Sequence, residues 1–483
     1  MRRLLSPVAL IALISIALCA NNAAAQPGAA GSWEGSISVL GTQIGIVVVM
    51  TADGSGYKAT VDIPQQGAKG LSLLNVRVDG TKIHFELMGQ PRLAVFEGEQ
   101  QSDTISGTFK QATVEGTFDL KRGAALAAAK AAAATLTASA VPPPYKEEAV
   151  KYEAGSVTRA CTLTLPVSSK PSPAVVMITG SGAQNRDEEI LGFKIFQVIA
   201  DHLTRHGIAV LRCDDRGVGG STGSNAKSTT ADFADDTLAG VKYLQTRSEI
   251  DRTHIGLMGH SEGGIVAPML AARSSEIAFI ILMSGSGLPG EQILYAQSEL
   301  TTQAAGRPME QARHNQEIQR KMFAAVHSGT GWDEVAAMLR VDLQASIDAL
   351  PADQRQGLGD PEKFIQAKIN EQLTSIRTPW FKFFLEYDPG TALDKVKCPT
   401  LVLFGEHDVQ VAAGPNRAAM EKAFARGGVK NYRVVVFPRA NHLYQDSPTG
   451  SVTEYGTLKK EFVPGFLDLI STWIGEQTGS KGR

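Results

Sequence analysis

A chain of 483 residues is too long for one ordinary globular domain, and its 43% of hydrophobic residues is typical of folded proteins. The formal net charge of −2 provides no basic surface of the kind that nucleic acid needs. We therefore expect a globular protein of more than one domain, with no nucleic-acid partner, that acts on a small molecule.

The first 25 residues have the composition of a secretory signal. Arg2-Arg3 precedes an apolar stretch at 8–18, and the alanines at 23–25 predict cleavage after Ala25. The apolar stretch is too short to span a bilayer, and no later segment is long and apolar enough. At Cys19 we expect no lipid anchor, because Leu18 stands where lipoprotein signals usually have a small residue. The prediction is an exported protein, periplasmic or secreted.

Three cysteines follow the predicted signal, namely Cys161, Cys213 and Cys398. Their odd number and wide spacing match neither a disulfide framework nor a zinc site. One bridge is compatible with an oxidising compartment, but the spacing does not choose the pair. Because all three lie in or beside strand-like runs, we expect buried, small apolar side chains.

Residues 32–122 are predicted to form an all-β domain. Short alternating runs such as 44–49 and 82–87 are separated by turns such as 52–56 and 78–81. We expect about eight strands that close into a barrel, since closure removes exposed sheet edges. Residues 123–146, rich in alanine and then proline, are predicted to be a linker that is part helical and part extended.

Strands and helices alternate over 147–478, which predicts an α/β domain with a mostly parallel, doubly wound sheet. We expect a helix that contains Leu191 and Ile195 and ends at Gly207, and a second that begins with the capping pair Thr229 and Asp232. The expected strands are 174–178, 208–211, 254–258, 277–283, 400–404 and 433–437.

About a hundred residues, 289–386, separate two of these strands. Insertions of this length usually carry helices that cover an active site, so we predict a helical cap. The helical run 333–343 and the aromatic residues of 380–384 favour a cap with an apolar underside. The alternative is that the insertion packs against the side of the domain and takes no part in the active site.

Ser261 is the predicted nucleophile. It lies in Gly259-His260-Ser261-Glu262-Gly263, directly after the strand 254–258 and directly before the apolar run 265–270. This strand, turn and helix lift a serine hydroxyl above a sheet, and the small residues beside it permit the sharp turn. Ser221 has the same glycine spacing, but its polar surroundings predict a loop. The alternative for Ser261 is a glycine-rich turn without chemistry.

A serine needs an oriented imidazole as its base. Among nine histidines, His442 follows the last predicted strand, where a loop can lean over Ser261, and His407 is its rival. We expect Asp408, after the strand 400–404, to orient the imidazole, with Glu406 as the alternative acid. The remaining histidines lie in less suitable places: His84, His202, His206, His254, His260, His314 and His327.

The oxyanion that forms in an acyl-transfer reaction is stabilised by hydrogen-bond donors that are already in position. We predict the backbone N–H of Glu262 and that of Ser181, with Gly182 as the alternative for the second. The run 214–217 is interpreted as a structural loop. No zinc-protease motif, phosphate loop or dinucleotide fingerprint occurs in its required context, so we expect neither a cofactor nor a metal.

Four motifs, namely 179–188, 215–221, 259–264, and 398–400 with 405–411, resemble exported bacterial esterases of the α/β-hydrolase superfamily, which are often grouped with serine aminopeptidase-like hydrolases. The resemblance covers about residues 147–478, and such proteins often carry a small β-rich domain in front. It implies a carboxylic ester hydrolase with the triad Ser261, Asp408 and His442, in the chain order of that superfamily. Many members have His-Gly at the oxyanion strand, where this chain has Thr179-Gly180.

Three other functions stay open. An aminopeptidase or amidase would use the same triad and a carboxylate for the free amino terminus, for which Glu386 is a candidate. An acyl thioesterase is also compatible. A protein without enzyme activity would use the β domain to bind carbohydrate or lipid, beside a degenerate hydrolase scaffold. The sequence predicts neither the acyl chain, nor the alcohol, nor the oligomeric state.

Overall fold

The fold was analysed in a computed structural model, which describes residues 28–39, 42–53, 56–63, 68–87, 94–111, 114–123, 143–349, 355 and 360–479. The predicted signal with Cys19, and the linker from 124 to 142, lie outside the described residues. Within them, no helix combines the length and the apolar character that crossing a membrane requires.

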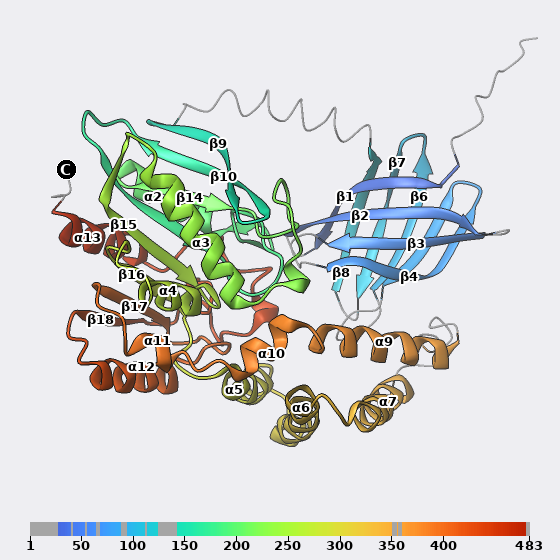
Figure 1. The fold of residues 1–483 in the computed structure, drawn as a ribbon. Helices are drawn as coiled ribbons and strands as arrows, with labels where there is room; N and C mark the ends of the chain where they lie inside the picture. Colours follow the sequence, from blue (N-terminus) through green and yellow to red (C-terminus); the bar gives the residue numbers. More distant parts are fainter. Residues whose placement is uncertain are drawn as a thin grey trace, which may run out of the picture.

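The front part of the chain is a closed antiparallel barrel, as the alternating pattern predicted (Figure 1). Each strand pairs with the next, and β1 pairs with β8 to close the barrel. Phe85, Phe96 and Phe118 are buried inside and pack ring against ring. The strands are β1 (Gly31–Val39), β2 (Thr42–Asp53), β3 (Gly56–Ile63), β4 (Ala68–Asp79), β5 (Lys82–Leu87), β6 (Ala94–Gln101), β7 (Thr104–Gln111) and β8 (Val114–Arg122).

The second part contains an eight-stranded sheet in the order β18-β17-β16-β15-β11-β14-β10-β9. The strands from β11 to β18 are parallel, while β10 and β9 add an antiparallel edge. The bounds are β9 (Tyr145–Ala154), β10 (Val157–Pro166), β11 (Ser172–Ile178), β14 (Ala209–Cys213), β15 (Ile250–His260), β16 (Ile280–Met283), β17 (Thr400–Gly405) and β18 (Tyr432–Phe437). This arrangement confirms the predicted fold class.

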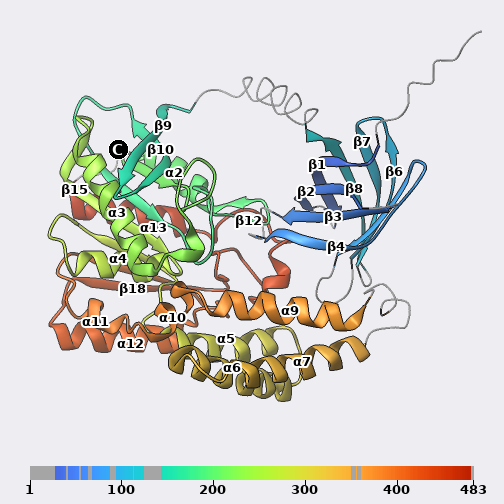
Figure 2. The ribbon, with the colours of Figure 1, turned by 45° about the vertical axis from the view of Figure 1, so that its right-hand side comes forward.

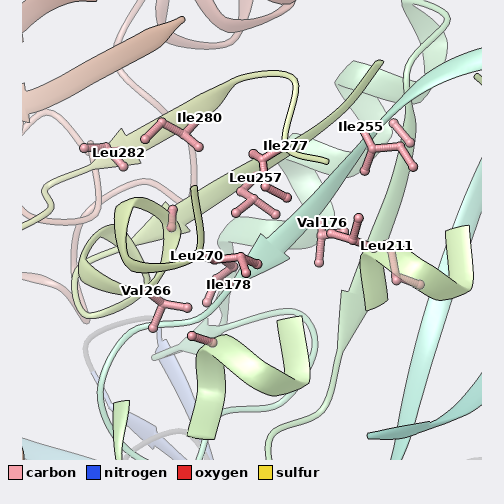
Figure 3. Packing of buried hydrophobic residues seen from close by; sticks show 14 of the residues in the cluster. Val176, Ile178, Leu211, Ile255, Leu257, Val266, Leu270, Ile277, Ile280 and Leu282 are labelled. Atoms are coloured by element: carbon pink, nitrogen blue, oxygen red, sulfur yellow. The ribbon is translucent and has the colours of Figure 1, made fainter. Parts of the chain in front are cut away.

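Helices cover both faces of the sheet. Figure 3 shows one face, where Val266 and Leu270 of α4 pack with sheet residues such as Val176 and Leu257. That face also carries α3 (Thr230–Gln245), α11 (Gly390–Leu393) and α12 (Ala413–Gly427), and α4 spans Gly263–Ala271. The other face is covered by α2 (Ile195–Arg205) and α13 (Phe466–Thr478). The described residues also include the short 3-10 helices η2 (Asn225–Lys227) and η3 (Val452–Glu454).

The observed starts of α3 and α2 can be compared with the helix starts predicted from the sequence. The capping box of Thr229 and Asp232 is formed at the start of α3, as predicted. The helix predicted to include Leu191 begins only at Ile195, because Leu191 lies in a tight hairpin with φ 50°. The hairpin joins β12 (Glu189–Ile190) to β13 (Phe193–Lys194).

The insertion between β16 and β17 is helical and has its own apolar core. Its helices are α5 (Gly290–Ala304), α6 (Met309–Ser328), α7 (Trp332–Asp348), α9 (Pro361–Ile376) and α10 (Pro379–Glu386). Figure 2 shows α9 beside β4 of the barrel, and Leu74 of β4 packs against this core. The barrel and the insertion therefore touch.

Cys161 of β10 and Cys213 of β14 stand opposite each other and form a disulfide. The expectation of free, buried cysteines is wrong for this pair. The antiparallel pairing of β10 with β14 brings together residues that are 52 positions apart, which the spacing alone did not reveal. Cys398 is free and half-buried.

Candidate active site

The turn between β15 and α4 holds Ser261 in a left-handed conformation, with φ 53°. Such a value is rare outside glycine and marks a backbone held under strain by its surroundings. A Cβ atom at Gly259 would lie 1.9 Å from the carbonyl oxygen of Gly263, so the turn closes only with glycine there. The Ser261 N–H donates to the carbonyl of Met283, at 2.8 Å, which fixes the serine at the carboxyl end of β16.

His442 and Asp408 are brought together by the loops that follow β18 and β17. His442 Nδ1 donates to Asp408 Oδ2 at 2.8 Å, and both residues are buried. The other oxygen, Oδ1, accepts the N–H groups of Gln410 (2.9 Å) and Val411 (2.8 Å). Burial alone would raise the pKa of Asp408, but the pairing with His442 and the backbone N–H of Val411 hold that pKa below its usual value.

Glu406 and His407, the alternative acid and base, form hydrogen bonds with backbone groups outside the pair of His442 and Asp408. Glu406 accepts the backbone N–H of Arg439 at 2.9 Å. His407 Nδ1 is 2.7 Å from the carbonyl oxygen of Ser447, to which it donates. Neither residue contacts the pair formed by His442 and Asp408 through a hydrogen bond in the described part of the chain.

The serine and the histidines that were not assigned to the triad also have local hydrogen-bond partners. Ser221 is buried, where its hydroxyl donates to the Asp214 carbonyl and accepts the Ala160 N–H. Other histidines bond to nearby groups: His84 to Glu86 and Glu97, His254 to Asp251, His314 to Asp342, His327 to Glu291 and Glu386, His202 to Ser471, and His206 to the His202 carbonyl.

His260, which the sequence analysis set aside, connects three parts of the site. Its Nδ1 lies 2.9 Å from Glu188 Oε1, and its Nε2 lies 3.0 Å from the carbonyl oxygen of His442. The His442 carbonyl can only accept, so Nε2 of His260 carries a proton, while Nδ1 faces the carboxyl group of Glu188. Burial alone would lower the pKa of His260, but the Glu188 carboxylate raises it above 6.5. Glu188 also accepts the N–H of Gly180, at 2.7 Å.

These contacts bring the loop after β11 against the serine. A Cβ atom at Gly180 would lie 3.2 Å from the Cβ atom of Ser261, so the small residue permits the close approach. The preceding Thr179 donates its hydroxyl to Asp215 at 2.8 Å. In this chain the Thr179 hydroxyl therefore connects the loop after β11 to the loop 214–217 through a hydrogen bond.

That run is held by ion pairs, in agreement with its structural interpretation. Asp214 pairs with Arg186, and Arg216 pairs with Asp236. Burial raises the pKa of Asp215 to about 7, although Arg159 and its hydrogen-bond donors lower it in part.

Glu262 combines two features. Its backbone N–H, at the start of α4, makes no hydrogen bond within the described residues. Its buried carboxylate accepts the Thr230 hydroxyl and the Trp380 indole N–H, each at 2.7 Å. Burial raises the pKa of Glu262. Gly182, with φ 96°, follows Ser181 in the loop.

Asp408 has a further neighbour that the sequence analysis missed. The side chain of Ser284, directly after β16, helps to lower the pKa of Asp408. Its hydroxyl is also 3.1 Å from that of Tyr444, which donates to the Leu403 carbonyl at 2.8 Å. A polar residue directly after a buried strand was the available signal for Ser284. Among the described residues, no group of three or more His, Cys, Asp or Glu side chains is arranged to hold a metal ion.

Comparison with known proteins identifies the family. Residues 175–454, more than half of the chain, match the alpha/beta hydrolase family. This chain belongs to the alpha/beta hydrolase family. The match includes the turn with Ser261 and the loops with Asp408 and His442, and it confirms the resemblance found in the sequence.

Esterase EstD of Thermotoga maritima is 26% identical to this hydrolase over 313 residues, which are 65% of this chain. The alignment covers 64% of EstD, so the chain spans just under two thirds of that relative. Pyrococcus furiosus esterase Pf2001 is similar in structure, with 16% sequence identity and a TM-score of 0.40. The match covers 70% of this chain and 92% of the esterase. Proline iminopeptidase of Mycobacterium smegmatis is 17% identical to this chain, with a TM-score of 0.42. The match covers 68% of this chain and 98% of the iminopeptidase.

Proposed function

We propose that this protein is a serine hydrolase of carboxylic esters, with Ser261 as nucleophile, His442 as base and Asp408 as the acid that orients the base. The observation that carries the proposal is the bond between His442 Nδ1 and Asp408 Oδ2 at the sheet edge where Ser261 has its left-handed turn. A carboxylate on Nδ1 leaves Nε2 of the neutral ring without a proton, which a general base requires.

The reaction then has two halves. His442 Nε2 takes the hydroxyl proton while Ser261 Oγ attacks the ester carbonyl carbon, and the carbonyl oxygen becomes an oxyanion. The N–H groups of Glu262 and Ser181, or of Gly182, donate to that oxyanion. When the carbon–oxygen bond breaks, the leaving alcohol takes the proton from His442. Water attacks the acyl-enzyme with the same base, which releases the acid and regenerates Ser261.

Two observations favour an ester over an amide. The relative EstD is named an esterase. Glu386, the candidate for binding a free amino terminus, is already bonded to Lys382 and His327 on the surface of the insertion. The pairing with Lys382 lowers the pKa of Glu386, so its charge is satisfied by side chains of the protein itself.

We also propose that the protein is exported, to the periplasm or the medium. The support is the signal composition of the first 25 residues together with the disulfide between Cys161 and Cys213, since disulfides persist in oxidising compartments.

A fluorophosphonate probe tests the proposed function, because it forms a covalent bond with an activated serine. We expect one label on the wild-type protein and none on Ser261→Ala, while Ser221→Ala still reacts. Panels of esters, aminoacyl arylamides and acyl thioesters then compare the substrate classes by kcat/KM, and we expect the esters to be turned over fastest. Labelling that persists in Ser261→Ala, or a faster arylamide, contradicts the proposal.

A further inference from the structure

His260, the residue before the nucleophile, belongs to a buried chain of hydrogen bonds that the proposed reaction does not use. Its Nε2 donates to the carbonyl oxygen of His442 at 3.0 Å, and its Nδ1 lies 2.9 Å from Oε1 of Glu188. The same Oε1 accepts the backbone N–H of Gly180 at 2.7 Å. One pair of side chains therefore joins the turn of the nucleophile to the loop of the base and to the loop after β11.

Packing alone does not explain two ionisable side chains at this position. His260 and Glu188 are each 1% exposed, and Oε2 of Glu188 makes no hydrogen bond within the described residues. Burying an imidazole and a carboxyl group costs free energy, so apolar side chains of similar volume would be at least as stable. Glu188 also has a left-handed backbone, with φ 43°, which is unfavourable outside glycine. These costs indicate a role beyond filling space.

The loop that carries His442 is held to the rest of the site from two sides. The Asn441 side chain accepts N–H groups of the same loop, and the Tyr444 hydroxyl donates to a carbonyl of β17. Towards the nucleophile, the direct hydrogen bond found in the described part of the chain is the one from His260. The rings of His260 and His442 also contact each other, with centroids 4.7 Å apart.

We propose that His260 is a positioning residue that holds the backbone of His442 against the turn of the nucleophile, and that Glu188 orients the His260 ring. The proposal rests on the proposed function, because it concerns the nucleophile and the base named there. The proton of Ser261 Oγ reaches His442 Nε2 only when the two side chains are aligned. A small displacement of a reacting group lowers turnover strongly, even when the displaced group itself is intact.

Two contacts then share the placement of the base. The Asp408 carboxylate on Nδ1 sets the tautomer and the rotation of the His442 ring. The bond from His260 to the His442 carbonyl sets the position of the backbone from which that ring projects. Loss of the first contact changes where the proton resides, whereas loss of the second lets the whole residue shift relative to Ser261.

Glu188 carries the same hold to the other side of the nucleophile. A Cβ atom at Gly180 would lie 2.9 Å from Glu188 Oε1 and 3.2 Å from the Cβ atom of Ser261. The backbone of Gly180 is therefore packed between the carboxyl group and the nucleophile. Because one oxygen contacts both the Gly180 N–H and the His260 ring, a change at Glu188 should disturb both sides of the turn.

Asparagine and glutamine at position 260 separate the two bonds of the ring. The amide nitrogen of glutamine reaches the place of Nε2, so His260→Gln keeps a donor for the His442 carbonyl. The amide nitrogen of asparagine reaches the place of Nδ1, so His260→Asn keeps only the contact with Glu188.

Steady-state kinetics on a p-nitrophenyl ester compare these variants. His260→Ala should lower kcat by about 100-fold, with KM changed by less than about threefold. His260→Gln should stay within about tenfold of wild type, while His260→Asn should lose nearly as much as His260→Ala. Glu188→Gln keeps an acceptor oxygen for both of its donors, so it should retain more turnover than Glu188→Ala.

Thermal melts and a covalent probe distinguish positioning from a purely structural role. His260→Gln and His260→Asn each lose one buried contact, so their melting temperatures should fall by similar amounts although their turnover differs. The rate of labelling by a fluorophosphonate should fall in parallel with kcat, since that reaction needs the same base. The matched control is His254→Asn in the first half of β15, where His254 Nδ1 lies 2.8 Å from Asp251 Oδ2, and it should leave kcat within about twofold.

The outcomes separate this proposal from the proposed function. If Ser261→Ala retains turnover, the proposed function fails. If Ser261→Ala is inactive while folded His260→Ala keeps kcat within about twofold of wild type, only the positioning role is overturned. Equal turnover of His260→Asn and His260→Gln also overturns it, because the bond to the His442 carbonyl would then have no effect. If His260→Ala does not fold, the comparison of these two variants decides the question.

Discussion

The substitution Asp408→Asn provides the sharpest test of how the base is oriented. Asp408 Oδ1 accepts two backbone N–H groups, from Gln410 and Val411, and Oδ2 faces His442 Nδ1. In the variant the amide oxygen must take the place of Oδ1, because two N–H donors cannot face an NH₂ group. The NH₂ group then points at Nδ1 and donates to it. The imidazole is held with its proton on Nε2 and cannot accept the proton of Ser261.

This wrong tautomer should lower kcat by about 10⁴-fold, which corresponds to about 5.4 kcal/mol of transition-state stabilisation. The fold should persist, since the shape of the side chain and the two backbone bonds are kept. The assay is turnover of a p-nitrophenyl ester at neutral pH, with a thermal melt of the same sample. Glu406→Gln, an equivalent change at the other candidate acid, should stay within about tenfold of wild type. A weaker effect for Asp408→Asn than for Glu406→Gln would refute the assignment of the acid.

Three further predictions concern side chains around the site. Ser221→Ala should keep most of the turnover and lose about 1–2 kcal/mol of unfolding free energy in a denaturant titration, because its buried hydroxyl makes two hydrogen bonds; an inactive, folded variant would mean that the wrong serine is assigned. The raised pKa of His260 stabilises the fold fully below pH 6.5, and this contribution is lost as pH rises through the folded-state pKa. His260→Gln should flatten that decline in melts above pH 6.5, and an unchanged slope would contradict it. Replacing Cys161 and Cys213 together by serine should lower the unfolding free energy by about 2–4 kcal/mol, whereas Cys398→Ser, the control, should not.

The parts of the site that could be predicted from sequence are those encoded within a few residues. The turn at Ser261 requires glycines at fixed neighbouring positions, and these stand next to it in the chain. The placement of Asp408 and His442 follows from parallel strands, whose carboxyl ends meet at one edge. A loop after such a strand therefore lies near the nucleophile wherever it occurs in the sequence.

The missed contacts join residues that are distant in the sequence. His260 and Glu188 are separated by 72 positions, and Trp380 and Glu262 by 118. No local pattern distinguishes such a pair from ordinary polar residues. The antiparallel edge of β9 and β10 was missed for a related reason, and with it the disulfide. Pairing partners depend on the register of the whole sheet.

The turnover of Ser261→Ala, compared with that of wild type on the same ester, tests the central claim most directly. If the hydroxyl of this residue forms the acyl-enzyme, kcat should fall by about four to six orders of magnitude while the melting curve stays the same. A folded Ser261→Ala protein that hydrolyses the ester at a rate near that of wild type would contradict the account.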